Sequence, residues 1–91
     1  MNTNVYKIEQ HDKFLVIDDD IEQAFHGTHF GTVDHRKLLE QGVLKTQAGY
    51  RTGYTLRIIM IELGLLTPRD YVTKKGRRFI FDAFQDRQHS G

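Results

Sequence analysis

The chain has 91 residues, enough for one domain and not for two, and it contains no cysteine. The absence of thiols excludes disulfides, cysteine nucleophiles and cysteine-based zinc sites. The net charge of +1 is unevenly spread: residues 1–33 carry two basic against six acidic residues, or −4, and residues 34–91 carry eleven against six, or +5. A basic C-terminal part favours an anionic partner.

The N-terminal residues and the apolar runs indicate a soluble protein. Met1–Asp12 lacks the basic start and the apolar stretch of a secretory signal. The longest apolar run, Ile58–Ile61, has four residues, far fewer than the ~20 that a membrane-spanning helix needs. We therefore expect a cytoplasmic protein without a membrane partner.

The first elements that the sequence predicts are a hairpin and a short helix. Residues 1–17 are rich in β-formers on either side of a His-Asp pair, so they could form an N-terminal β-hairpin. Three consecutive aspartates, Asp18–Asp20, offer N-cap groups and a favourable charge for a helix from Ile21 to about His26. Gly27 ends that helix and begins a loop.

Two longer helices follow. Asp34 can cap a helix over residues 35–47, in which Gly42 indicates either close packing or a break. A turn with two glycines then leads to a third helix over about residues 52–63, and Gly64 is placed to end it.

The last elements are a small hairpin and a C-terminal helix. The Pro-Arg-Asp sequence at 68–70 suits a tight turn, so residues 65–72 are expected to form a β-hairpin. Thr73 can cap a helix over about residues 74–84, and the polar residues 85–91 are expected to be a flexible tail. The apolar positions of this helix fall on one face and are Phe79, Ile80, Ala83 and Phe84.

This order of elements resembles a winged helix-turn-helix domain. The residues that carry the resemblance are Leu63–Leu66, similar to the "LGL" that often ends a recognition helix, and Tyr71–Phe79, similar to an "LTxKGR" helix start. The resemblance covers about residues 34–84. It implies an α+β fold with a three-helix core, a short β-hairpin wing and a C-terminal helix, in a single domain (1–91) whose body is residues 18–84.

A longer pattern resembles small uncharacterised proteins encoded in enterobacterial prophages, and it covers most of residues 18–84. This second resemblance implies a phage or bacterial accessory protein and supplies no activity. Its residues are Phe30-Gly31, Gly42–Lys45, Gly49-Tyr50 and Thr52–Leu56.

We interpret the chain as a small winged-helix DNA-binding protein of phage or bacterial type and a transcriptional modulator, with double-stranded DNA as its partner. The start of the third helix would meet base edges in the major groove, and basic residues around it would contact phosphates. The candidate groove contacts are Arg51, Thr52, Thr55 and Arg57. The candidate phosphate contacts are Lys45, Lys74, Arg77 and Arg78.

The third helix also supports an alternative. Leu56, Ile59, Met60 and Leu63 form one apolar stripe, and a second stripe lies almost opposite. The second stripe is either covered by N-terminal residues or contacts a twin subunit or a host protein. The alternative function is therefore a protein-interaction module, homodimeric or aimed at a host factor. Its residues are Tyr54, Ile58 and Ile61.

No pattern in the sequence indicates catalysis or a bound metal. The only serine is Ser90, near the C-terminus. His26, His29 and His35 match no standard zinc spacing, and the three aspartates lack the alternating ligands of a calcium loop. We therefore expect a protein that is not an enzyme and uses no cofactor or metal.

Overall fold

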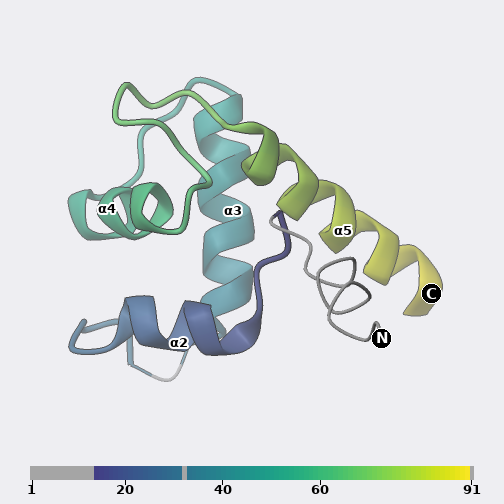
Figure 1. The fold of residues 1–91 in the computed structure, drawn as a ribbon, viewed down its shortest axis with the longest axis horizontal. Helices are drawn as coiled ribbons and strands as arrows, with labels where there is room; N and C mark the ends of the chain where they lie inside the picture. The colour runs from purple at the N-terminus through teal and green to yellow at the C-terminus, as the bar shows by residue number, and fades with distance from the viewer. Residues whose placement is uncertain (1–13, 32, 91) are drawn as a thin grey trace, which may run out of the picture.

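A computed structural model of the chain describes residues 14–31 and 33–90, with side chains up to Gln85. Its helices are α2 (Asp18–Phe25), α3 (His35–Gln47), α4 (Tyr54–Glu62) and α5 (Lys74–Ser90) (Figure 1). None of these helices is both long and apolar enough to cross a lipid bilayer.

Helix α3 lies at the centre of the fold. Helices α2 and α4 pack on α3 and on each other, and α5 packs on α3 from another direction. Figure 1 shows this arrangement, with α3 between α5 and the pair formed by α2 and α4. Among the described helices α5 therefore contacts α3 alone, while α2, α3 and α4 form a three-helix unit.

The expected α+β winged-helix fold is wrong, because residues 14–31 and 33–90 form four helices and no strand. The hairpin expected at 65–72 is reduced to a single antiparallel bridge between Leu66 and Val72. The Thr67 hydroxyl accepts the backbone N–H of Tyr71 at 3.1 Å, so the chain reverses direction directly after the bridge residue Leu66. Since Thr73 already caps α5, no residues remain to extend the bridge into a pair of strands.

Only the end of the expected N-terminal hairpin, residues 14–17, lies within the described residues. These four residues form no strand. Val16 is buried in the core and so ties this segment to the helices.

The core is formed by apolar side chains from the helices and from the segments that flank them. Leu56, Ile59 and Met60 on α4 are buried, as their spacing predicts. The buried residues that form this core cluster are Val16, Ile21, Phe25, Leu39, Val43, Leu56, Ile59, Met60, Leu65, Leu66, Phe79 and Ile80.

Two glycines in helices mark close contacts. A Cβ added at Gly42 would lie 3.0 Å from the sulfur of Met60 and 3.1 Å from a methyl group of Leu56. The sequence left close packing and a break open at Gly42, and α3 is continuous there, so close packing is the reason. A Cβ at Gly76 would lie only 2.3 Å from the carbonyl oxygen of Leu65.

Local signals place most of the helix ends. The Asp34 carboxylate accepts the backbone N–H of Lys37 at 3.1 Å, and the Thr73 hydroxyl accepts that of Gly76 at 3.0 Å. Gly64 has φ +79° after α4, and Leu65 N donates to Met60 O at 2.9 Å, as in a Schellman ending.

Two helices are longer than expected. Helix α2 begins at Asp18 rather than Ile21, so the three aspartates lie inside its first turn, next to the positive end of the helix dipole. Helix α5 continues past Phe84 to Ser90, where a flexible tail was expected. Phe84 also departs from the expected buried face, because it is 46% exposed while Phe79 and Ile80 are buried.

Candidate nucleic-acid interface

The start of α4 and the segment before it are open to solvent. Helix α3 ends in a turn at Gly49, whose φ is +91°, and Gly53 occupies the N-cap of α4 without a side-chain cap. Arg51 is exposed and makes no hydrogen bond or ion pair with any described residue. Tyr54 is 76% exposed, and Thr55 beside it is exposed as well. The first turn of α4 therefore presents polar groups outward.

Two adjacent hollows bring several of the predicted site residues together. The smaller, of about 160 Å³, lies between the C-terminal half of α3 and the segment that enters α4, and Lys45, Arg51 and Thr52 line it. The larger, of about 350 Å³, is lined by Arg51, Thr52 and Arg57, and it reaches the turn at 67–70. Four of the predicted residues thus surround the junction of α3 and α4.

Arg57 differs from Arg51 in being held by the protein itself. Its Nε donates to a carboxylate oxygen of Asp70 at 2.5 Å, and its Nη2 donates to the carbonyl oxygen of Pro68 at 2.7 Å. The guanidinium of Arg57 thus bonds to the 67–70 turn and holds this turn against α4. Nothing in the sequence distinguishes the two arginines, because the partner of Arg57 lies 13 residues further along the chain.

The remaining basic candidates lie at the start of α5, and none of them lines either hollow. Lys74 is exposed. Arg77 is exposed and donates to the carbonyl oxygen of Val72 at 3.2 Å. Arg78 forms an ion pair with Asp82 one turn later, at 3.1 Å.

Thr55 lines a separate hollow of about 260 Å³ with the loop before α3.

The apolar trio of the alternative function is only partly exposed. Tyr54 is open to solvent, whereas Ile58 and Ile61 are half-buried. Ile61 packs against the hydrophobic core. The three residues therefore offer a smaller apolar surface than their spacing on α4 predicts.

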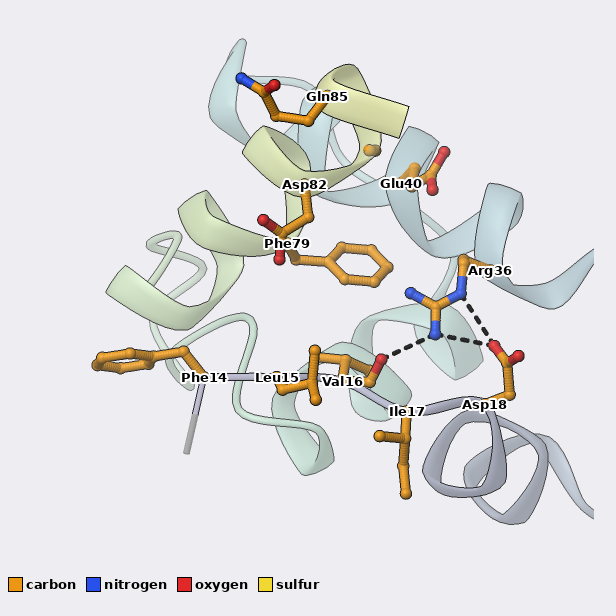
Figure 2. A pocket seen from close by; sticks show the side chains of 11 residues that line it. Phe14, Leu15, Val16, Ile17, Asp18, Arg36, Glu40, Phe79, Asp82 and Gln85 are labelled. Atoms are coloured by element: carbon orange, nitrogen blue, oxygen red, sulfur yellow. Dashed lines mark hydrogen bonds and ion pairs between the residues drawn. The ribbon is translucent and has the colours of Figure 1, made fainter. Parts of the chain in front are cut away.

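Sequence reasoning missed the residues around a further hollow, of about 510 Å³, between residues 14–18, α3 and α5. There Arg36 donates to the carbonyl oxygen of Val16 at 2.8 Å and to Asp18 at 2.8 Å (Figure 2). Its guanidinium carbon lies 5.6 Å from the ring centre of Phe79. No local pattern predicts these contacts, because they join residues that lie 18, 20 and 43 positions apart in the sequence.

Of the histidines near α2, only His35 is held inside the protein. Its ring stacks on Phe25 with centroids 4.2 Å apart, and its Nδ1 contacts the Glu22 carboxylate at 3.0 Å. Its Nε2 is buried and has no hydrogen-bond partner among the described residues. Across the residues that the structure describes, no three His, Asp or Glu side chains gather as a metal site would require.

Comparison with known proteins gives no match: no family model fits the chain, and no curated protein or solved structure is significantly similar to it. A function is therefore to be inferred from the geometry of these residues.

Proposed function

We propose that the protein binds double-stranded DNA through the start of α4 and the segment that leads into it. The observation that carries the proposal is that Arg51 has no partner among the described residues and lies beside exposed Tyr54 and Thr55. A guanidinium of this kind can donate paired hydrogen bonds to a guanine edge or to a phosphate.

The packing of α4 supports this proposal. One side of α4 packs on α2 and α3 through Leu56, Ile59 and Met60, which leaves its N-terminal turn outside. Proteins that bind DNA with two helices joined by a turn present the N-terminal residues of the second helix to the major groove. Helices α3 and α4 have this order, so Arg51 and Thr55 are the proposed groove contacts.

The distribution of exposed basic side chains adds support. Lys45 is exposed and lines the same hollow as Arg51, and Lys74 and Arg77 are exposed at the start of α5. Figure 1 places the end of α3 and the start of α5 in the same upper part of the molecule. Phosphate contacts from such residues add affinity that falls with salt. Arg57 and Arg78 already have carboxylate partners and are left out of the proposed contacts.

The resemblance to regulators extends this proposal to a role as a transcriptional modulator of phage or bacterial type. The protein-interaction alternative stays a prediction. Because Ile58 and Ile61 are half-buried, we favour DNA.

Fluorescence anisotropy of a labelled mixed-sequence duplex tests the proposal. We expect binding at about 50 mM salt that weakens steeply as salt rises, because each neutralised phosphate releases counterions. Arg51→Ala should weaken binding at least tenfold, since an arginine contact to a base is worth about 1–3 kcal/mol. Absence of binding by the wild-type protein at low salt would refute DNA as the partner.

A matched pair of lysines on α3 provides the control. Lys45 and Lys37 are both exposed, but Lys45 lies in the last turns of α3, beside Arg51, and Lys37 lies in the first turn. Lys45→Ala should weaken binding several-fold and reduce the salt slope by about one. Lys37→Ala should leave both unchanged. Equal effects of the two variants would indicate unspecific attraction to net charge instead of the proposed interface.

A further inference from the structure

We infer that the hollow between α4 and the 67–70 turn is a subsite for one DNA phosphate. In the free protein the Asp70 carboxylate is paired with Arg57, one of the two arginines that line this hollow. The inference rests on the proposed DNA-binding function and adds an affinity-determining residue to it. The hollow, of about 350 Å³, opens beside the first turn of α4. Its lining residues are Thr46, Arg51, Thr52, Tyr54, Arg57, Leu66 and Asp70.

The chemistry of the lining favours an anion with several acceptor oxygens. Two arginines, Arg51 and Arg57, and one carboxylate, Asp70, line the hollow, and Arg57 is paired with Asp70. Thr52 adds a hydroxyl group that can donate a hydrogen bond, whereas the Thr46 hydroxyl already donates to the carbonyl oxygen of Gly42 at 2.9 Å. A phosphate group accepts hydrogen bonds from guanidinium in the same fork-like geometry as a carboxylate does. The Arg57–Asp70 contact therefore already shows how Arg57 would hold a phosphate oxygen.

Asp70 is placed at Arg57 by the backbone of its turn. The Asp70 N–H donates to the carbonyl oxygen of Thr67 at 2.9 Å, and the Thr67 hydroxyl accepts the N–H of Tyr71 at 3.1 Å. Asp70 itself has φ +70°, a left-handed conformation that aspartate and asparagine tolerate better than most residues other than glycine. The backbone of the turn thus holds the carboxylate on Arg57.

This placement makes Asp70 a competitor of the DNA backbone. An incoming phosphate meets the free Arg51 first, and it gains Arg57 only when that guanidinium turns away from Asp70. The carboxylate also repels the phosphate. Removing the negative charge of Asp70 should therefore strengthen DNA binding, and most of the gain should require Arg57.

Two substitutions remove this charge without disturbing the turn. Asp70→Asn keeps the size of the side chain, and asparagine tolerates the left-handed conformation. Asp70→Gly removes the side chain and suits φ +70° without strain. Loss of the surface ion pair with Arg57 should change stability little. Thermal unfolding followed by circular dichroism verifies that each variant is folded.

Anisotropy titrations of the labelled duplex at several salt concentrations test the inference on the full chain. Asp70→Asn and Asp70→Gly should each bind about fivefold more tightly at low salt, with a salt slope steeper by about one, as expected for one more phosphate contact. Arg57→Ala alone should weaken binding, because it leaves the Asp70 carboxylate without its cation beside the phosphate. In the Arg57→Ala background Asp70→Asn should strengthen binding by less than about twofold, because only the repulsion by Asp70 is then removed and no arginine is released.

Glu62→Gln serves as the charge-matched control, because Glu62 is exposed at the end of α4 and lines a different hollow. It should raise affinity less than twofold. An equal gain from Glu62→Gln, or a gain from Asp70→Asn that is as large without Arg57 as with it, overturns the inference. Arg51-dependent binding that Asp70→Asn does not strengthen overturns it while leaving the proposed function intact. No binding by any variant refutes the function and the inference together.

Discussion

Replacing Gly76 with alanine should destabilise the protein strongly, although alanine is the better helix former. Gly76 lies in the first turn of α5, and a Cβ there would stand 2.3 Å from the carbonyl oxygen of Leu65 and 2.8 Å from a methyl group of Val72. The Leu65 oxygen accepts the N–H of Thr73 at 3.1 Å and so cannot move alone. The start of α5 would have to shift away from the preceding loop.

Gly42 provides the matched comparison for this magnitude. It is also a buried helical glycine, but its Cβ would meet only the flexible ends of Met60 and Leu56, at 3.0 and 3.1 Å. In both helices alanine gains up to about 1 kcal/mol from intrinsic propensity. Overpacking costs about 1–3 kcal/mol, the larger values applying where the neighbour cannot yield. We expect Gly42→Ala to change the free energy of unfolding by less than about 1 kcal/mol, and Gly76→Ala to lower it by about 2 kcal/mol.

Urea unfolding followed by circular dichroism measures both variants against the wild-type protein. In thermal unfolding of a domain of this size, a loss of 2 kcal/mol in the free energy of unfolding corresponds to a fall in Tm of about 8–16 °C. The reasoning is refuted if Gly76→Ala is as stable as the wild type, or if Gly42→Ala proves the more damaging of the two.

Three more substitutions test contacts elsewhere in the fold. His35→Phe should keep the stacking on Phe25 and remove the buried Nε2 that has no partner among the described residues, so the free energy of unfolding should rise by about 1 kcal/mol; a lower urea midpoint would contradict this. Arg36→Ala should lower it by about 1–2 kcal/mol, because the carbonyl oxygen of Val16 loses its donor. Asp18→Asn should lower it by less than about 0.5 kcal/mol, since the Asp18 side chain is 82% exposed, and a larger loss would show that the ion pair matters more than the carbonyl contact.

The helices were predictable where the signal is local. The bounds of α3 follow from the Asp34 cap and the apolar spacing after it, and the end of α4 follows from Gly64, which supplies the left-handed φ. These signals depend on residues within one turn of the chain, so the sequence alone contains them.

The hairpin was not predictable from the same kind of signal. The turn at 68–70 is present, but a strand also needs a partner along its length, and Leu65 and Leu66 are buried in the core. The sequence could not show that α5, which Thr73 caps, begins too soon after Val72 for a second pair of residues to join the bridge. Phe84 was misplaced for a related reason, because helical spacing identifies an apolar face but not how much of it a neighbour covers.

The candidate site was predictable only as a set of residue types. The sequence placed Arg51 and Arg57 together around the third helix, and the structure separates them into one free guanidinium and one bound by Asp70. That difference depends on the packing of the 67–70 turn against α4. Asp70 was therefore missed, although it is the residue that decides what Arg57 can contact.

Among the helices α5 packs on α3 only, and this has a consequence for how the molecule opens. Residues that share few tertiary contacts with the rest of a protein exchange their amide hydrogens through partial unfolding, at a lower free energy than global unfolding requires. Detaching α5 breaks its packing on α3 and on the segment that contains Leu65 and Val72, and it leaves the contacts among α2, α3 and α4 in place. A protease that cleaves transiently exposed chain should therefore cut within α5 first, while the three-helix remainder stays protected.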